Sequence, residues 1–355
     1  MKWDDLIGHH RQRQWFARAL ESGRMASSFL FIGTEGIGKR TFARLVAKSV
    51  LCRSTSPDSL DFCGSCEDCV QVDAGTHPDL IEVAKPEDRA EIPTELLIGS
   101  RERRNREGMC HDLSMKPRGG RRKIAILDDA DHLNEEGANC LLKTLEEPPG
   151  RSILFLVGTS MQRQLPTIRS RCQSILFQPL TVDELAELVL RLDLAQSADS
   201  ARQLAELSEG SLMVAQGLAD PQMQAFRSML WTALARSALP ITRLIKECDG
   251  LVGEAGKEAR RRRDRLKLLM YMAAEFYRAV ALLQQTDPAH AADLVQNKEL
   301  RELAMSVARR ATCGPQDAIR CWDRCLRGIE QVERNANQAT LIEAWFCDLA
   351  YSSRA

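Results

Sequence analysis

The sequence lacks both a long apolar run and an excess of charge of either sign. Its longest apolar runs, such as LLMYMAA from Leu268, fall far short of the roughly 20 residues that span a bilayer, so we expect no membrane helix. The formal net charge is +0 at pH 7, so any affinity for nucleic acid must come from local patches and not from a global field. The first residues, MKWDDLIGHHRQRQW, contain acids and lack the apolar core of a secretory signal. Together these absences predict a cytoplasmic protein.

The composition is ordinary for a folded protein except in cysteine. The chain is 44% hydrophobic and 28% charged, values typical of globular proteins, and its 355 residues predict two or three domains. It also has 12 cysteines. Because cytoplasmic thiols stay reduced, a clustered subset of them indicates a metal site before it indicates a disulfide.

The first half alternates apolar strands with helical stretches. Strands are predicted at 28–33, 122–131 and 152–160, and helices at 39–51 and 134–147. Because strand and helix alternate, we predict an α/β fold with a parallel sheet covered by helices. Ligands of such folds bind at the carboxyl ends of the strands.

The strand signals fade after about Pro179. Thr181 and Glu184 form a capping-box pattern that opens a helix, and from about Pro221 to the end the pattern is helical only. We therefore predict an α/β domain at 1–179, a small helical domain at 180–220 and an all-α domain at 221–355. The last domain has apolar residues that could form its own core or a subunit interface, including Leu266, Leu269, Met270 and Phe276.

The segment GTEGIGKRT at 33–41 nearly completes the phosphate-binding pattern G-x-x-x-x-G-K-[ST]. Such a loop points backbone N–H groups and a helix N-terminus at phosphate, and its lysine adds positive charge. The alternative is a glycine-rich turn without a ligand. Arg40 stands where a hydroxyl should hold Mg²⁺, and Thr41 is turned away from that position by about 100°. The candidate nucleotide-binding residues of this loop are Gly33, Gly36, Gly38, Lys39 and Thr41.

The strand at 122–131 ends in acids, as does the second motif of nucleotide-binding folds. Asp128 stands at the position of the metal-associated acid and is the sixth candidate nucleotide-binding residue. Asp129 follows it and is one methylene shorter than the glutamate that orients water in hydrolysing enzymes with this motif. The alternative is a pair of helix-capping acids at a strand end.

Four cysteines with the spacing C-x10-C-x2-C-x2-C predict a structural zinc site. They are Cys52, Cys63, Cys66 and Cys69, within a module at about 52–80. Short C-x2-C steps let thiolates converge on one tetrahedral Zn²⁺, and four sulfurs leave no open position for catalysis. The alternatives are buried free thiols, an iron–sulfur cluster, or participation of His77 as a ligand. The other cysteines are interpreted as small core residues: Cys110, Cys140, Cys172, Cys248, Cys313, Cys321, Cys325 and Cys347.

Arginines follow the third strand in LPTIRSRCQSILF, at 169 and 171. Spacing alone leaves open whether Arg169 and Arg171 bind phosphate in this chain, reach a neighbour's active site or are only solvated. Further basic clusters lie at 101–106, 118–123 and 260–263. Each could contact DNA phosphate without reading sequence, or form a solvated surface.

The order of these motifs resembles the bacterial sliding-clamp loaders of the AAA+ class. The similarity rests on GTEGIGK, the cysteine quartet, HPDL, ILDDAD, NCLLKTLEEPP, GTS and LPTIRSRCQ, and is detailed over about residues 1–180. The resemblance implies a nucleotide-fold domain with zinc, a helical lid and a helical collar that holds subunits in a ring. It also implies that Arg171, in the Ser-Arg-Cys motif, reaches the γ-phosphate bound by an adjacent subunit.

Within this family the chain is more similar to the delta prime type than to the gamma/tau ATPase type of DNA polymerase III. Gamma-type loaders carry Thr, Glu and Arg where this chain has Arg40, Asp129 and Met213. The resemblance therefore implies a subunit with slow or absent hydrolysis, whose ATP or ADP site is weak or vestigial. Expected partners are gamma/tau-type ATPase subunits, a delta subunit and, through the complex, the sliding clamp and primer–template DNA. The alternatives are an active gamma/tau-type ATPase and an unrelated zinc-bearing scaffold that binds nucleic acid.

Overall fold

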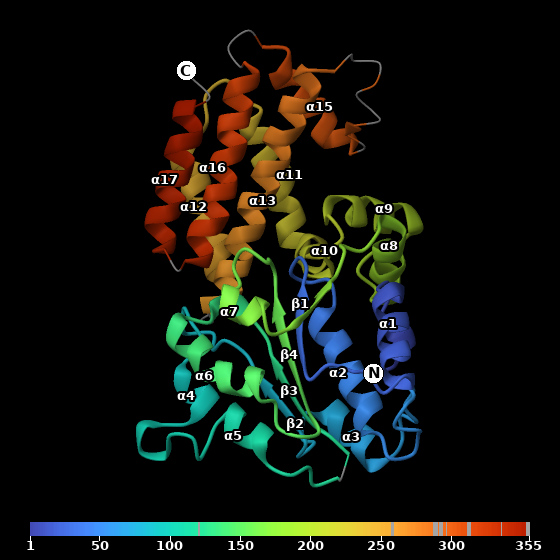
Figure 1. Ribbon diagram of the computed structural model, residues 1–355. Helices are drawn as coiled ribbons and strands as arrows, with labels where there is room; N and C mark the ends of the chain where they lie inside the picture. The colour runs from blue at the N-terminus through green and yellow to red at the C-terminus, as the bar shows by residue number, and fades with distance from the viewer. Residues whose placement is uncertain are drawn as a thin grey trace. The chain divides into compact units, whose positions relative to one another are not determined.

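The fold was analysed in a computed structural model (Figure 1), which describes residues 1–119, 121–256, 259–286, 290, 294–295, 297–310, 314–334 and 336–352. The strands are β1 (Ser28–Ile32), β2 (Leu80–Val83), β3 (Lys123–Leu127), β4 (Ser152–Gly158) and β5 (Gln173–Leu176). The helices of the N-terminal part are α1 (His10–Glu21), α2 (Lys39–Leu51), α3 (Glu67–Ala74), α4 (Thr94–Ile98), α5 (Met109–Ser114), α6 (Glu135–Glu146) and α7 (Pro166–Arg169). Short 3₁₀ turns lie at Trp3–Asp5, Arg101–Arg103 and Ala130–His132.

The strands form one parallel sheet in the order β2-β3-β4-β1-β5. The predicted parallel α/β sheet is therefore confirmed, and its three predicted strands are the central ones. β2 and β5 were not predicted from the sequence. Both are four-residue edge strands without a fully buried face pattern, so they lack the continuous apolar run that marked the central strands.

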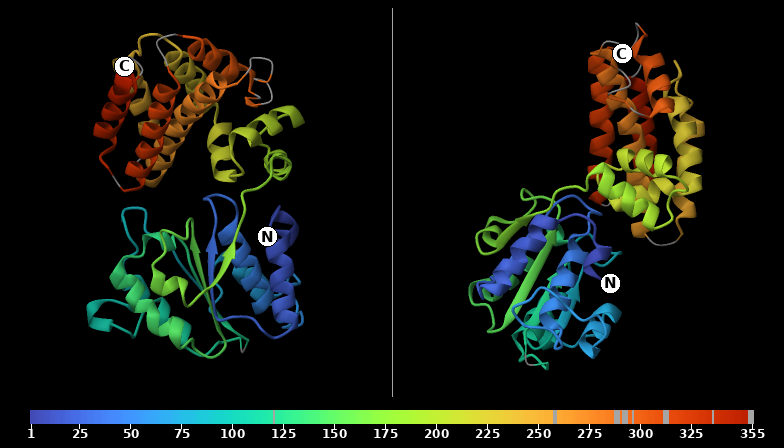
Figure 2. Two further views of the ribbon diagram at one scale, coloured as in Figure 1. Left: turned by 45° about the horizontal axis from the view of Figure 1, so that its top comes forward. Right: turned by 90° about the vertical axis from the view of Figure 1, so that its right-hand side faces the viewer.

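Helices cover both faces of this sheet (Figure 2), each over its own apolar cluster. On one face, phenylalanines of β1 and β4 meet Phe16 of α1 and Phe42 of α2. On the other face, alternate residues of the same strands pack against α4, α5 and α6. Burial on both faces explains why β1, β3 and β4 are apolar after their first residues, which are Ser28, Lys123 and Ser152.

The rest of the described chain is helical. Its elements are α8 (Val182–Arg191), α9 (Ala198–Leu207), α10 (Leu212–Ala219), α11 (Pro221–Leu234), α12 (Ile241–Glu254), α13 (Ala259–Gln284), α15 (Lys298–Ala308), α16 (Pro315–Glu333) and α17 (Gln338–Ser352). The predicted capping box is present, because the backbone N–H of Thr181 donates to Glu184 Oε2 at 2.8 Å and that of Glu184 to Thr181 Oγ1 at 3.3 Å. None of the described helices is both long and apolar enough to cross a membrane.

The long helix α13 lies at the centre of the C-terminal helices and packs along α11, α12, α15 and α16. The apolar residues for which core and subunit interface were both open, Leu266, Leu269, Met270 and Phe276, are fully buried within this chain. Trp231 of α11 fixes the packing further, since its indole N–H donates to the carbonyl of Met272 at 2.9 Å. These residues therefore belong to the core of this chain.

The chain divides into two compact units. One contains Met1–Leu188 together with Glu209–Met213, and the other contains Val189–Ser208 and 214–355. The short segment Glu209–Met213 thus packs with the α/β unit, apart from its sequence neighbours. The three-part division at 179 and 220 stays a prediction.

Candidate nucleotide, metal and arginine sites

The glycine loop connects β1 to α2, as its motif requires. Gly36 and Gly38 adopt φ values of 78° and 94°, in the left-handed region that favours glycine. Lys39 is the first residue of α2, so its side chain starts at the helix N-terminus. The loop therefore has the backbone course of a phosphate-binding turn.

The lysine of this loop is held by the loop itself. Lys39 Nζ donates to the carbonyls of Gly33 at 2.5 Å and Thr34 at 2.6 Å, and the side chain is largely buried. Burial lowers the pKa of Lys39, while the nearby Asp128 acts in the opposite direction. Two of its three N–H donors are therefore occupied by backbone and not directed at a ligand.

The segment Glu209–Met213 closes over the loop at Gly36. Ser211 Oγ donates to the carbonyl of Glu35 at 2.8 Å, and the backbone N–H of Leu212 donates to the carbonyl of Gly36 at 3.1 Å. A Cβ atom at Gly36 would lie 2.4 Å from Ser211 Oγ and 2.6 Å from Met213 Cβ. Met213, at the position for which the resemblance implies an arginine in gamma-type loaders, therefore packs against the loop.

Arg40 lies beside the acids at the strand ends. Its guanidinium forms ion pairs with Asp128 Oδ2 at 3.6 Å and with Glu82 Oε1 of β2 at 3.7 Å. Burial raises the pKa of Asp128, the negative charge of Asp129 adds to this, and Arg40 partly offsets it. The guanidinium of Arg40 therefore lies beside the carboxylate that the motif associates with Mg²⁺. Thr41, the remaining candidate, is half-buried on α2.

Three residues near the loop were not singled out from the sequence. Glu82 was missed because its edge strand was missed. Asp131 accepts from the backbone N–H of Thr159 and from Gln164 Nε2, both at 2.6 Å, and so ties the ends of β3 and β4 together. His9 packs behind the loop, with Nε2 2.6 Å from the carbonyl of Ile37, and burial lowers its pKa. These roles depend on contacts between residues far apart in the sequence, so no local pattern indicates them.

The four predicted metal ligands converge. Sγ of Cys52 lies 3.7 Å from that of Cys63 and 3.8 Å from that of Cys66, and Sγ of Cys63 lies 4.0 Å from that of Cys69. All four sulfurs are within 4.8 Å of one another. Zn–S bonds of about 2.3 Å in a tetrahedron place sulfurs about 3.8 Å apart, so the arrangement fits Zn²⁺, while a disulfide would need about 2.05 Å.

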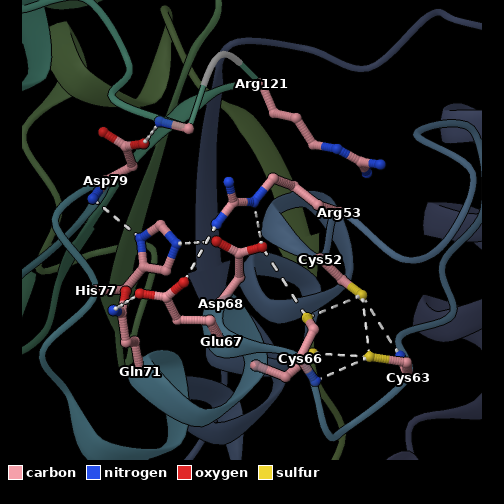
Figure 3. A network of polar contacts seen from close by, with 12 residues as sticks. Cys52, Arg53, Cys63, Cys66, Glu67, Asp68, Gln71, His77, Asp79 and Arg121 are labelled. Atoms are coloured by element: carbon pink, nitrogen blue, oxygen red, sulfur yellow. Dashed lines mark hydrogen bonds and ion pairs between the residues drawn. The ribbon is translucent and has the colours of Figure 1, made fainter.

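The surroundings of the sulfurs also suit a metal site (Figure 3). Backbone N–H groups of Ser65 and Cys66 face Cys63 Sγ and lower its pKa to about 5, which favours the thiolate that Zn²⁺ requires. Cys52 accepts from the backbone N–H of Cys63 at 3.5 Å. The quartet draws on the end of α2, the loop that follows it and the start of α3, so a metal would hold these segments together.

A polar network links the quartet to the start of β2 (Figure 3). Asp68 accepts from Arg53 Nε at 2.7 Å and lies 3.4 Å from His77 Nε2, while His77 Nδ1 accepts from the backbone N–H of Asp79 at 3.0 Å. His77 therefore carries its proton on Nε2 and faces Asp68, outside the four sulfurs. The Asp79 carboxylate accepts from the backbone N–H groups of Arg118 and Gly119 at 2.9 and 2.8 Å. Buried polar groups of this module are thus paired along its length.

Arg171 follows α7 and folds back toward the end of α6. Its Nε and Nη2 donate to Glu146 Oε1 at 2.9 and 2.6 Å, and Nη1 donates to the carbonyl of Thr167 at 3.0 Å and to Ser170 Oγ at 3.2 Å. Arg169, two residues earlier, is exposed. The guanidinium of Arg171 is one third exposed, so it lies at the surface but is anchored by this chain.

Each basic cluster has arginines held by neighbouring groups, by acids in the first cluster and by backbone carbonyls in the other two. In the first, Arg103 pairs with Glu107 and Arg104 with Glu136. In the second, Arg121 Nη2 donates to the carbonyl of Thr55 at 2.7 Å. In the third, Arg262 Nε donates to the carbonyl of Gly256 at 2.6 Å. Gly120, the side chain of Arg260 and Cys313 lie outside the described residues.

Comparisons with known proteins agree with the motif order. A family model described as DNA polymerase III, delta subunit, matches residues 8–181. The delta′ subunit of Pseudomonas aeruginosa DNA polymerase III is 37% identical over 194 residues, covering 54% of this chain and 56% of the relative. The corresponding delta′ subunit of Bacillus subtilis is 32% identical over 190 residues, covering 54% of this chain and 53% of the relative.

A longer match joins the chain to the tau subunit. The DNA polymerase III subunit tau of Escherichia coli is 30% identical over 324 residues, which cover 85% of this chain and 47% of the relative. The chain thus spans about half the length of the curated relatives it matches. Because the chain is similar to both delta′ and tau subunits, overall similarity does not decide between the two types, and the comparison must rest on the residues of the site.

Proposed function

Because this chain belongs to the AAA+ clamp-loader family of DNA polymerase III, we propose that it is a clamp-loader subunit that hydrolyses ATP slowly or not at all and lends Arg171 to a neighbouring ATPase subunit. The observation that carries this proposal is the ion pair between Arg40 and Asp128. Both the hydroxyl ligand of Mg²⁺ and the free carboxylate beside it are replaced by a protein salt bridge.

The rest of the pocket supports the loss of hydrolysis. Asp129 replaces the water-orienting glutamate, Met213 replaces the phosphate-sensing arginine, and Lys39 is bound to its own loop. Phosphoryl transfer depends on such groups for electrostatic stabilisation of the transition state. Replacing several of them at once therefore predicts slow or absent hydrolysis.

The arginine can outlast this loss because its chemistry takes place in another subunit's pocket. Arg171 lies on a surface turn after α7, and its helix follows β4, the central strand of the sheet. A rigid sheet and a short helix are a suitable base for presenting one guanidinium to a neighbour. In this proposal the chain is the stator of the ring.

The remaining parts have structural roles in the proposal. Zn²⁺ held by the cysteine quartet would order the module at about 52–80 and supply no catalysis, because four thiolates complete its coordination. Residues 1–179 act as the nucleotide-fold domain, 180–220 as the lid and 221–355 as the collar. Exposed Ile319 and Leu326 on α16 offer apolar surface for neighbouring collar subunits. Partners in this proposal are gamma/tau-type ATPases and a delta subunit, with the sliding clamp and DNA reached through the complex.

The test is reconstitution with a gamma/tau-type ATPase and a delta subunit. We expect Arg171→Ala to lower the ATPase rate of the complex at least roughly tenfold without changing its assembly, because arginine fingers in trans carry large rate factors. Arg169→Ala, an exposed neighbour on the same turn, is the matched control and should leave the rate unchanged. An unaltered rate for Arg171→Ala in a fully assembled complex would refute the finger role.

The second candidate function is an active ATPase of the gamma/tau type. It is favoured by the match to the tau subunit over 85% of this chain and by the retained Lys39. In that case the isolated chain should show Mg²⁺-dependent ATP turnover that Lys39→Ala abolishes. We expect no such turnover.

A further inference from the structure

The guanidinium of Arg171 is almost fully engaged by its own chain. An arginine has five N–H donors, and four of those of Arg171 are directed at Glu146 Oε1, the Thr167 carbonyl and Ser170 Oγ. These contacts leave one N–H of Nη2. A guanidinium binds phosphate best through two parallel N–H donors, so the observed arrangement cannot bind a phosphate in this way without giving up a contact.

We propose that Glu146 is a latch on Arg171, which must open before the arginine reaches the phosphate of a neighbouring subunit. This inference rests on the proposed finger role and adds its regulation. In the free subunit, Glu146 keeps the guanidinium folded over the end of α7. When a neighbour brings nucleotide, its phosphate displaces the Glu146 carboxylate from Nε and Nη2.

The Glu146 contact is the one expected to yield. Glu146 is about half exposed and Arg171 about one third exposed, at 51% and 33%, so their ion pair is close to solvent and weak. Nε and Nη2, which both donate to the same oxygen of Glu146, are also the two donors that form a parallel pair on one edge of the guanidinium. A phosphate bound there would face the Glu146 carboxylate at close range, and like charges repel. The Thr167 and Ser170 contacts use Nη1 and can remain.

Removing the charge of Glu146 should change the neighbour's hydrolysis rate in opposite directions for a latch and for a positioning residue. If Glu146 merely oriented Arg171 for catalysis, removing its charge would slow the neighbour's hydrolysis. If Glu146 competes with phosphate, removing its charge makes the arginine easier to recruit. The direction of the effect therefore decides between the two roles.

The experiment uses the reconstituted complex and measures ATPase rate against the concentration of this chain. We expect Glu146→Gln to lower the half-saturating concentration, or to raise the rate below saturation, by about 1.5- to 5-fold, the range for breaking an exposed ion pair. Glu147→Gln, which neutralises the next residue after α6, is the control and should change neither value. The gain from Glu146→Gln must vanish when Arg171 is also replaced by Ala, because the latch acts only through that side chain.

A measurement on the isolated chain tests the latch without a partner. Solvent exchange of the Arg171 Nε–H, followed by NMR, should become faster in Glu146→Gln, while the thermal midpoint should stay the same. An unchanged or lower ATPase rate for Glu146→Gln, in a complex whose rate Arg171→Ala does lower, would overturn the latch and leave the finger role standing. If Arg171→Ala itself has no effect, the proposed function fails and the latch fails with it.

Discussion

Replacing Arg40 by Thr should make ATP binding by the glycine loop depend on Mg²⁺. The substitution supplies the missing hydroxyl and removes a positive charge beside Asp128. Arg40 is 46% exposed and its two ion pairs measure 3.6 and 3.7 Å, so their loss should cost about 1 kcal/mol or less each and leave the chain folded. A stable fold makes the nucleotide affinity of this variant interpretable.

The size of the effect follows from the charge alone. Two unit charges 4 Å apart interact by about 1 kcal/mol in bulk water, the appropriate limit for a half-exposed arginine. The repulsion between the single charge of Arg40 and the two charges of Mg²⁺ therefore amounts to about 2 kcal/mol, or roughly 30-fold in the affinity for Mg²⁺-bound ATP. The Thr hydroxyl adds to that gain as a ligand.

The assay is isothermal titration with ATP in Mg²⁺ and in EDTA. We expect the wild-type chain to bind ATP equally weakly in both, and Arg40→Thr to bind roughly 30-fold more tightly in Mg²⁺ than in EDTA. Arg44→Thr is the control, because Arg44 also pairs with Glu82, at 3.5 Å, but lies one helical turn further from the loop. Equal affinities of Arg40→Thr in the two buffers would show that the charge of Arg40 is not what keeps Mg²⁺ out.

Three further predictions concern metal, stability and pH. Cys66→Ser should abolish stoichiometric zinc binding, as measured by metal analysis, and should make the remaining ligand thiols reactive toward a thiol reagent. Cys248 should stay unreactive, because burial raises its pKa to about 12. Asp79→Ala should lower the unfolding free energy in urea by about 3–5 kcal/mol, because it leaves buried Lys123 unpaired, whereas the exposed Asp88→Ala should not. Burial raises the folded-state pKa of Asp128, so the protein loses stability as pH rises through that pKa and the buried carboxyl ionises. Asp128→Asn cannot ionise and should therefore have a higher melting temperature than the wild type at pH 7. Near pH 3.8, where the wild-type carboxyl is protonated in the folded state, the two melting temperatures should be the same.

The sequence predicted those features that are local or continuous. β1, β3 and β4 were found because each is an apolar run buried on both faces, and the Thr181 capping box because its partners are three residues apart. The cysteine quartet was found for the same reason, since three of its ligands follow a short repeat. Features of this kind need no knowledge of the tertiary fold.

Contacts between distant segments could not be predicted. The pairing of Arg40 with Glu82 requires that β2 lie beside β3, and β2 is a short edge strand with no distinctive pattern. The latch between Glu146 and Arg171 joins residues on either side of β4. Helical periodicity likewise could not tell the core residue Phe276 from an interface residue, because both require the same apolar face.

In the proposed function the two arginines have opposite roles: Arg40 keeps a metal out of this chain's own loop, and Arg171 serves the pocket of a neighbour. Arg40 and Arg171 each bind a carboxylate of their own subunit, but in different surroundings. Arg40 lies beside Asp128 and Glu82, whose negative charge, together with that of Asp129, would attract a divalent cation; in the proposed function its positive charge opposes that binding. Arg171 faces one half-exposed carboxylate that a phosphate can displace. Both side chains are at least one third exposed and weakly paired, so the number of acids around each arginine, and not the strength of a single ion pair, separates their proposed roles.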